Sequence, residues 1–209
     1  MTTLLYIKAS PRADSRSAAI ADAYLAALRA VTPAMAIDTL DVWTEALPEF
    51  DGNKVNAKMS VVTGQPHDEA QKTAWDEISA IAARFVAADR YLFAVPMWNG
   101  GIPYRLKHYI DLIHQPGITF GLDRANGYFG RLAGKRATLV LTSGAYSPEA
   151  PSPAFGVDHH STYLRSWLKQ AGVTDVEEIL FQPTVLTADP AGDLARAIAV
   201  AQAAASKPD

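Results

Sequence analysis

Cysteine, a long apolar run and an excess of basic residues are all missing from this 209-residue chain, and each absence excludes a class of protein. Without cysteine there is no disulfide, thiol nucleophile or thiolate-ligated metal, a composition that suits a reducing cytoplasm. No apolar stretch approaches the ~20 residues that span a bilayer, and the opening segment MTTLLYIKASPR lacks the ordered features of a signal peptide. Lysine and arginine number 19 against 22 acidic residues, so we expect neither a nucleic acid nor a membrane as partner.

Familiar nucleotide-binding and catalytic motifs are missing as well. The first loop carries no G-x-G-x-x-G, and Gly134-Lys135 lacks the other residues of a P-loop. Neither the serine-hydrolase elbow G-x-S-x-G nor the metal motif HEXXH occurs. His108 and His114 are six residues apart, a spacing that places them on different faces of a helix. The sequence DHH at 158–160 is the only histidine cluster, and we interpret it as a solvated or substrate-facing helix start, so no metal site is expected.

Apolar residues make up 49% of the chain, which is enough to bury one core, and we expect residues 1–209 to form a single domain. Short apolar runs alternate with segments of helical periodicity in the order βαβαβαβαβα. Because the strands are apolar throughout, this pattern predicts a parallel sheet with helices on both faces. The expected strands are Leu4–Lys8, Met35–Val42, Arg90–Val95, Arg136–Leu141 and Val176–Phe181, and the expected helices are 18–30, Asp68–Ala88, Pro103–His114, Val157–Gln170 and Pro190–Ala205.

Two segments have no sustained period. Residues 43–65 contain proline, glycine and asparagine and predict a loop with a short helix. Residues 115–132 are rich in glycine and aromatic side chains and could form a hairpin flap.

In an open sheet of this kind, ligands bind beyond the carboxyl ends of the strands, where the strand order reverses. The loop after the first strand, Ala9–Ser17, places Ser10, Ser15 and Ser17 directly before a helix. Free N–H groups and the positive end of the helix dipole make such a position suitable for an anion, and hydroxyls bind a phosphate without a metal. The alternative is that these serines only form the turn and cap the helix.

The loops after the third and fourth strands are Pro96–Gly101 and Thr142–Ser147, and they suit a flat ring rather than an anion. Trp98 can cover a planar ligand, and the small residues behind it let backbone amides approach ring heteroatoms. By itself this loop could also be a glycine turn with a buried tryptophan. Taken together, the three loops suit a ligand with a monophosphate at one end and a flat polar ring at the other. Flavin mononucleotide (FMN) is such a ligand.

Specific stretches of the chain carry a family resemblance: IKASPRADSRS, PMWNGGIPYRLKHYIDLI with PGITF after it, GRLAGKRATLVLTSGAY and YLRSWLKQAGVTDVE. With these the chain resembles the FMN-dependent NADH azoreductases, also called NADH:quinone oxidoreductases, of the flavodoxin-like fold. The resemblance implies a five-stranded parallel sheet of order 2-1-3-4-5, tightly bound FMN and NADH or NADPH as electron donor. It further implies a quinone or azo acceptor, ping-pong hydride transfer and a homodimer with the site at its interface. Since the flavin performs the hydride chemistry, no catalytic side chain is expected.

The family's binding positions carry over residue by residue. Its phosphate contacts fall on Ser10, Ser15, Arg16 and Ser17, and its ring contacts on Met97, Trp98, Asn99, Gly100, Thr142, Ser143, Gly144 and Ala145. The chain departs from the family at Ser143 and Ala145, where arginine and a second glycine are common. It departs again at Gly100, where phenylalanine is frequent, and this leaves the shape of the acceptor pocket open.

Three other functions compete with this interpretation. An electron-carrier flavodoxin is typically smaller and strongly acidic, and this chain is neither. A reductase that uses free FMN as a substrate would lose its flavin during gel filtration. A phosphodiester hydrolase would require a metal or a nucleophile that the sequence does not offer.

Overall fold

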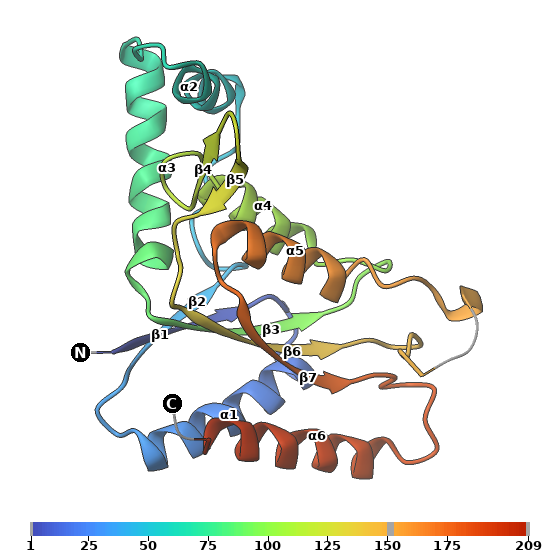
Figure 1. The fold of residues 1–209 in the computed structure, drawn as a ribbon. Helices are drawn as coiled ribbons and strands as arrows, with labels where there is room; N and C mark the ends of the chain where they lie inside the picture. Colours follow the sequence, from blue (N-terminus) through green and yellow to red (C-terminus); the bar gives the residue numbers. More distant parts are fainter. Residues whose placement is uncertain (1, 150–152, 208–209) are drawn as a thin grey trace.

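The computed structural model describes residues 2–149 and 153–207, which form a five-stranded parallel sheet between two layers of helices (Figure 1). The strand order is β2-β1-β3-β6-β7, which in chain order is the predicted 2-1-3-4-5. Each strand lies in register beside its neighbour, for example Leu4 beside Ile37 in β2 and beside Arg90 in β3. The strands are β1 Thr3–Lys8, β2 Ala36–Asp41, β3 Arg90–Pro96, β6 Arg136–Thr142 and β7 Asp175–Phe181.

Helices cover both faces of this sheet, each over its own core. Below the sheet in Figure 1, α1 (Arg16–Val31) and α6 (Pro190–Ala205) pack on side chains such as Leu4 and Leu92. Above it, α3 (Glu69–Ala87), α4 (Tyr104–Ile113) and α5 (Ser161–Ala171) pack on the other face. Because alternate residues of a strand point to opposite faces, both cores need apolar residues, which is why the strands are apolar throughout.

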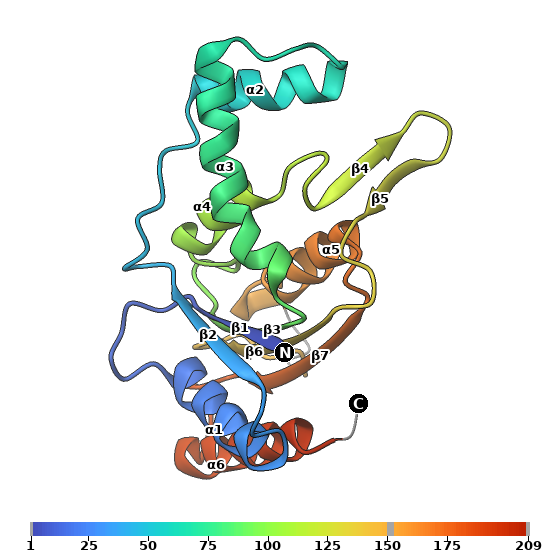
Figure 2. The same ribbon diagram turned by 90° about the vertical axis from the view of Figure 1, so that its left-hand side faces the viewer.

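The two segments without a sustained period both contain regular structure. Helix α2 (Gly52–Thr63) lies beside α3 at the end farthest from the sheet, and it is longer than the short helix that the sequence indicates. Strands β4 (Phe120–Asp123) and β5 (Gly127–Gly130) pair antiparallel and form the predicted hairpin flap, which projects outward in Figure 2.

Helix α5 begins at Ser161, later than the predicted Val157. The carboxylate of Asp158 accepts hydrogen bonds from the backbone N–H groups of His160 and Ser161, both at 2.8 Å. Such a side-chain contact holds residues 158–160 as a turn outside the helix. A short 3₁₀ turn at Pro153–Phe155 precedes it.

Within the described parts of the chain, no helix has both the length and the apolar character required to cross a membrane.

Candidate functional site

The three strand-end loops meet at one hollow of about 290 Å³ at the carboxyl edge of the sheet. This is the point where the order reverses, since β1 has β2 on one side and β3 on the other. Most of the sequence-predicted site residues line it, namely Ser10, Ser15, Arg16, Met97, Trp98, Thr142, Ser143 and Gly144. The fold has therefore brought together three segments that are about 85 and 45 residues apart in the chain.

The first loop ends at the amino terminus of α1, as the serine pattern predicts. Ser15 is the N-cap, and its hydroxyl accepts a hydrogen bond from the backbone N–H of Ala18 at 3.3 Å. The hydroxyls of Ser15 and Ser17 lie 3.1 Å apart, and both side chains are buried. The first backbone N–H groups of a helix have no acceptor within the helix, so this end combines free donors, two hydroxyls and a positive dipole. An anion such as a phosphate fits it.

The guanidinium of Arg16 crosses from α1 to the segment after β7. It donates to the backbone carbonyl of Thr184 at 2.6 Å and lies 5.8 Å from the centre of the Phe181 ring. Because a guanidinium has five N–H donors, this arrangement leaves others to face the hollow. Arg12, at the rim, pairs with Asp14 at 2.7 Å on the surface.

The second loop is a two-residue hairpin turn. Trp98 and Gly101 exchange two backbone hydrogen bonds of 2.9 Å, and the two residues between them, Asn99 and Gly100, have φ angles of 50° and 82°. Positive φ at both central positions is the type I′ turn, for which Asn-Gly is the preferred sequence. The turn explains the NGG run of the sequence, and it leaves Trp98 36% exposed beside the hollow.

Four of the predicted site residues do not themselves line the hollow, namely Ser17, Asn99, Gly100 and Ala145. A side chain at residue 100 would also meet an obstacle, since its Cβ would lie 3.1 Å from the backbone carbonyl of Val157. The carbonyl of Gly100 accepts a hydrogen bond from the N–H of His159 at 2.9 Å. The segment at 157–159 thus occupies space beside residue 100, and the aromatic side chain that is frequent there in the family does not fit this backbone without a shift.

The third loop is held by a segment that the sequence analysis missed. The N–H groups of Thr184 and Val185 donate to the carbonyls of Ser143 and Gly144 at 2.8 and 2.9 Å. Thr184 and Val185 also line the hollow, together with Pro96. The signal was available, because the loop after the fifth strand leaves the same edge of the sheet as the other three.

These residues fit FMN at both ends of the molecule. Buried hydroxyls and free N–H groups at the start of α1 match a phosphomonoester, and a partly exposed tryptophan beside backbone amides matches a flat, polar ring. The hollow of about 290 Å³ lies at the lower end of the range for ligand sites, so one chain leaves part of such a ligand uncovered.

Comparisons with known proteins agree with this geometry. A family described as having a flavodoxin-like fold matches residues 2–205. The chain belongs to this family. Within it, the chain is 50% identical over 205 residues to an FMN-dependent NADH:quinone oxidoreductase of Ruegeria pomeroyi, covering 98% of this chain and 100% of the relative. A second relative, FMN-dependent NADH:quinone oxidoreductase 9 of Burkholderia lata, is 41% identical over 95% of both chains.

A solved structure shows the same arrangement of elements. The azoreductase of Bacillus anthracis str. Sterne superposes with a TM-score of 0.88 over 100% of both chains, at 24% identity. This likeness shows that the two proteins share the flavodoxin-like fold.

A second hollow, of about 780 Å³, opens on the side of α4 and α5 in this flavodoxin-like chain. It begins at Gly101, directly after the hairpin turn, and is mostly lined by side chains of the two helices. Aromatic residues from three different segments face it, namely Phe50, Tyr104 and Tyr163. Its position beside the Trp98 loop makes it the natural continuation of the candidate site.

Proposed function

We propose that this chain is an FMN-dependent NADH:quinone oxidoreductase that also reduces aromatic azo compounds. The observation that carries the proposal is the pairing, in one hollow, of a serine-rich helix start with a partly exposed tryptophan beside an Asn-Gly turn. The names of the relatives at 50% and 41% identity support the same activity. We further propose residues 1–209 as one FMN-binding domain and the cytoplasm as its location.

The residues proposed to hold FMN act in two groups. The phosphate group is held by α1 and its loop, and the ring by the loops after β3 and β6. The phosphate set is Ser10, Ser15, Arg16 and Ser17, and the ring set is Met97, Trp98, Asn99, Gly100, Thr142, Ser143, Gly144 and Ala145.

Bound FMN supplies the chemistry, because a flavin accepts a hydride from NADH and passes it to an acceptor. The chain provides position and electrostatics. Trp98 would cover the flavin ring, and backbone N–H groups of the third loop would stabilise the negative charge of the reduced flavin. As the family resemblance implies, donor and acceptor would use one position over the flavin ring in turn, which predicts ping-pong kinetics.

We also propose a homodimer that completes the site. The β4–β5 flap projects from the body of the molecule (Figure 2), and its side chains Leu122, Tyr128 and Phe129 are 52%, 63% and 50% exposed. A hairpin of two four-residue strands has no stable core of its own, and exposed apolar side chains of this size mark contact surfaces. A second copy of the chain would cover both the flap and the second hollow, at α4 and α5.

Steady-state kinetics on the purified holoenzyme test the activity. NADH should bleach the bound flavin, and initial rates at several fixed quinone concentrations should give parallel double-reciprocal lines. Intersecting lines would contradict the shared position. An electron carrier would show no sustained NADH oxidation with quinone. A reductase of free flavin would lose FMN on gel filtration and regain turnover in proportion to added FMN.

A further inference from the structure

Trp43 touches both halves of the candidate site although it does not line the hollow. Its indole Nε1–H donates to the backbone carbonyl of Ala9, the first residue of the phosphate loop, at 3.0 Å. Its ring centre lies 5.5 Å from that of Trp98 at an angle of 45°, and 5.4 Å from that of Tyr104 at 87°. A single side chain therefore connects the loop after β1 with the loop after β3.

The short loop that carries Trp43 is fastened to α4, the helix that follows the Trp98 turn. Arg105 donates through Nε to the carbonyl of Val42 and through Nη2 to the carbonyl of Glu45, each at 2.9 Å. The backbone N–H of Trp43 donates to the Asp41 carboxylate at 3.0 Å. These bonds fix the backbone on both sides of Trp43.

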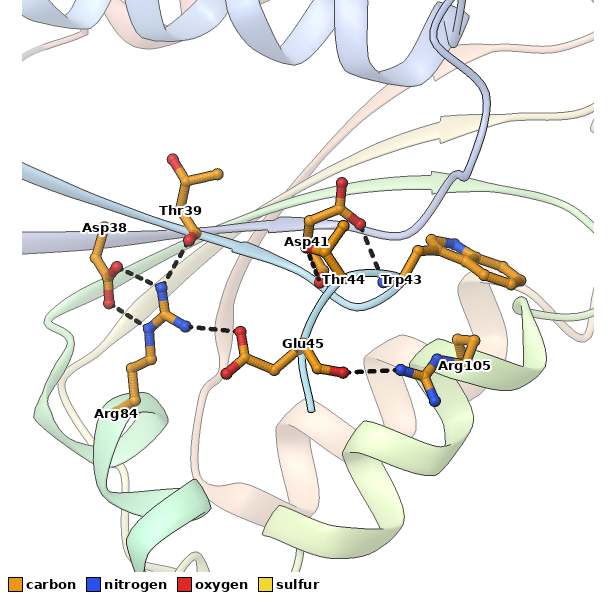
Figure 3. A network of polar contacts seen from close by, with 8 residues as sticks. All are labelled: Asp38, Thr39, Asp41, Trp43, Thr44, Glu45, Arg84 and Arg105. Carbon is orange, nitrogen blue, oxygen red and sulfur yellow. Dashed lines mark hydrogen bonds and ion pairs between the residues drawn. The ribbon is translucent and has the colours of Figure 1, made fainter. Parts of the chain in front are cut away.

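A second arginine fastens the same loop to α3. Arg84 binds both carboxylate oxygens of Asp38 at 2.5 and 2.6 Å and the Glu45 carboxylate at 3.2 Å. Two parallel N–H bonds from a guanidinium to a carboxylate hold a defined geometry as well as adding energy. Figure 3 shows the two arginines on either side of Glu45, with the Trp43 ring extending away from the charged groups.

We propose that Trp43 is a positioning residue for the flavin site. It holds Trp98 against the flavin ring and connects the loop after β3 to the phosphate loop. This inference rests on the proposed function. Trp98 follows β3 on a turn with two residues at positive φ and is 36% exposed, so its orientation depends on what supports its inner face. Tryptophan combines a large flat ring with an N–H donor, and in this loop the donor reaches the carbonyl of Ala9.

The two contacts of Trp43 predict different effects for two substitutions. Trp43→Phe keeps a ring against Trp98 but loses the hydrogen bond to Ala9, so FMN should bind about 2- to 12-fold more weakly. Trp43→Leu loses both contacts, so FMN should bind more weakly still, and the visible circular dichroism of the bound flavin should change. In Trp43→Phe that spectrum should stay close to the parent's, because Trp98 remains supported.

The experiment titrates apoprotein with FMN and records the visible circular dichroism of each holoprotein, with Trp75→Phe as matched control. Trp75 lies on α3 beside His67, at 5.6 Å between ring centres, and does not line the hollow. Parent-like affinity and spectrum in both Trp43 variants would overturn the proposal, as would an equal loss of affinity in Trp75→Phe. A parent protein that binds no FMN would refute the proposed function itself, and this inference with it.

Discussion

At the scale of single residues, Ser15 and Ser17 have different roles although their hydroxyls lie 3.1 Å apart. Ser15 caps α1 through the N–H of Ala18, whereas the hydroxyl of Ser17 lies beside that of Ser15, and we propose that it also binds the phosphate. Hydrogen bonds to charged groups contribute roughly 1.5–3 kcal/mol, so Ser17→Ala should weaken FMN binding about ten- to a hundredfold. Ser15→Ala should also lower the free energy of unfolding by about 0.5–2 kcal/mol, because the cap is lost.

Titration of apoprotein with FMN and urea unfolding separate the two effects. Ser60→Ala, on α2, is the control, since its hydroxyl donates to Gln71 far from the phosphate loop. If Ser15→Ala and Ser17→Ala both bind FMN like the parent, neither hydroxyl holds the phosphate, which then lies elsewhere or is held by backbone groups.

Gly100 has a backbone conformation that residues other than glycine rarely adopt. Its φ is 82°, and a Cβ there would meet the carbonyl of Val157 at 3.1 Å. Gly100→Ala should therefore lower the free energy of unfolding by about 1–2 kcal/mol, because an L-residue is strained in the left-handed region. Gly52→Ala, the control, has nothing within 4 Å of its Cβ, lies in the first turn of α2, and should be neutral or stabilising by up to about 1 kcal/mol.

Urea unfolding of the two alanine variants measures the difference. Gly100→Phe carries the same backbone strain, so it is a poor way to restore the family's aromatic wall. Equal stability of Gly100→Ala and the parent would mean that the Asn99–Gly100 turn relaxes without cost.

At the scale of elements, the junction of β3 and α5 contains a fully buried histidine. Burial lowers the pKa of His160 to about 4, with Asp158 nearby acting in the opposite direction. The unfolded chain takes up a proton near the ordinary histidine pKa of 6.5, whereas the folded chain does so only near 4. The free energy of unfolding should therefore fall as pH drops from 7 to 5, by on the order of 2 kcal/mol for this one group.

Urea unfolding at pH 7 and pH 5 tests this junction in the parent and in His160→Gln. The variant has no titrating group at this position, so its loss between the two pH values should be smaller than that of the parent. A remaining slope is expected, because burial also lowers the pKa of His114 to about 4. Identical slopes in the two proteins would show that His160 takes up its proton equally in both states.

At the scale of the whole molecule, the exposed β4–β5 flap and the second hollow at α4 and α5 predict a dimer. Light scattering should give twice the 22.5 kDa chain mass. Replacing Tyr128 and Phe129 together by serine removes exposed apolar surface, so the mass should fall toward that of one chain and quinone reduction should weaken. Val200→Ser on α6, 54% exposed on the opposite face of the sheet, should leave the dimer intact.

The mass and the rate must be measured on the same preparation. A monomeric flap variant with full activity would show that the site is complete within one chain. A parent that is monomeric at all concentrations and fully active would refute the dimer.

The local pattern of the sequence was sufficient for the parallel sheet and the three loops, whereas the strand order was what the family resemblance implied. Local rules account for this success: apolar strands indicate burial on both faces, and serines before a periodic segment indicate a capped helix start. The start of α5 was misplaced by four residues, because the apolar pattern continues into a turn that the Asp158 carboxylate holds outside the helix. The period of the apolar residues indicates which side chains are buried. It does not indicate where a polar side chain accepts hydrogen bonds from backbone N–H groups and so keeps a residue outside the helix.

What the sequence by itself determined about this protein is the order of its helices and strands along the chain and the serine-capped start of the first helix. These depend on residues close together in the chain. Only the tertiary structure placed Trp43 against Trp98 and Ala9, brought Thr184 and Val185 onto the third loop, and set the carbonyl of Val157 beside Gly100. Those contacts join residues 34 to 57 positions apart, and their partners are selected by how the helices pack on the sheet, which no local pattern records.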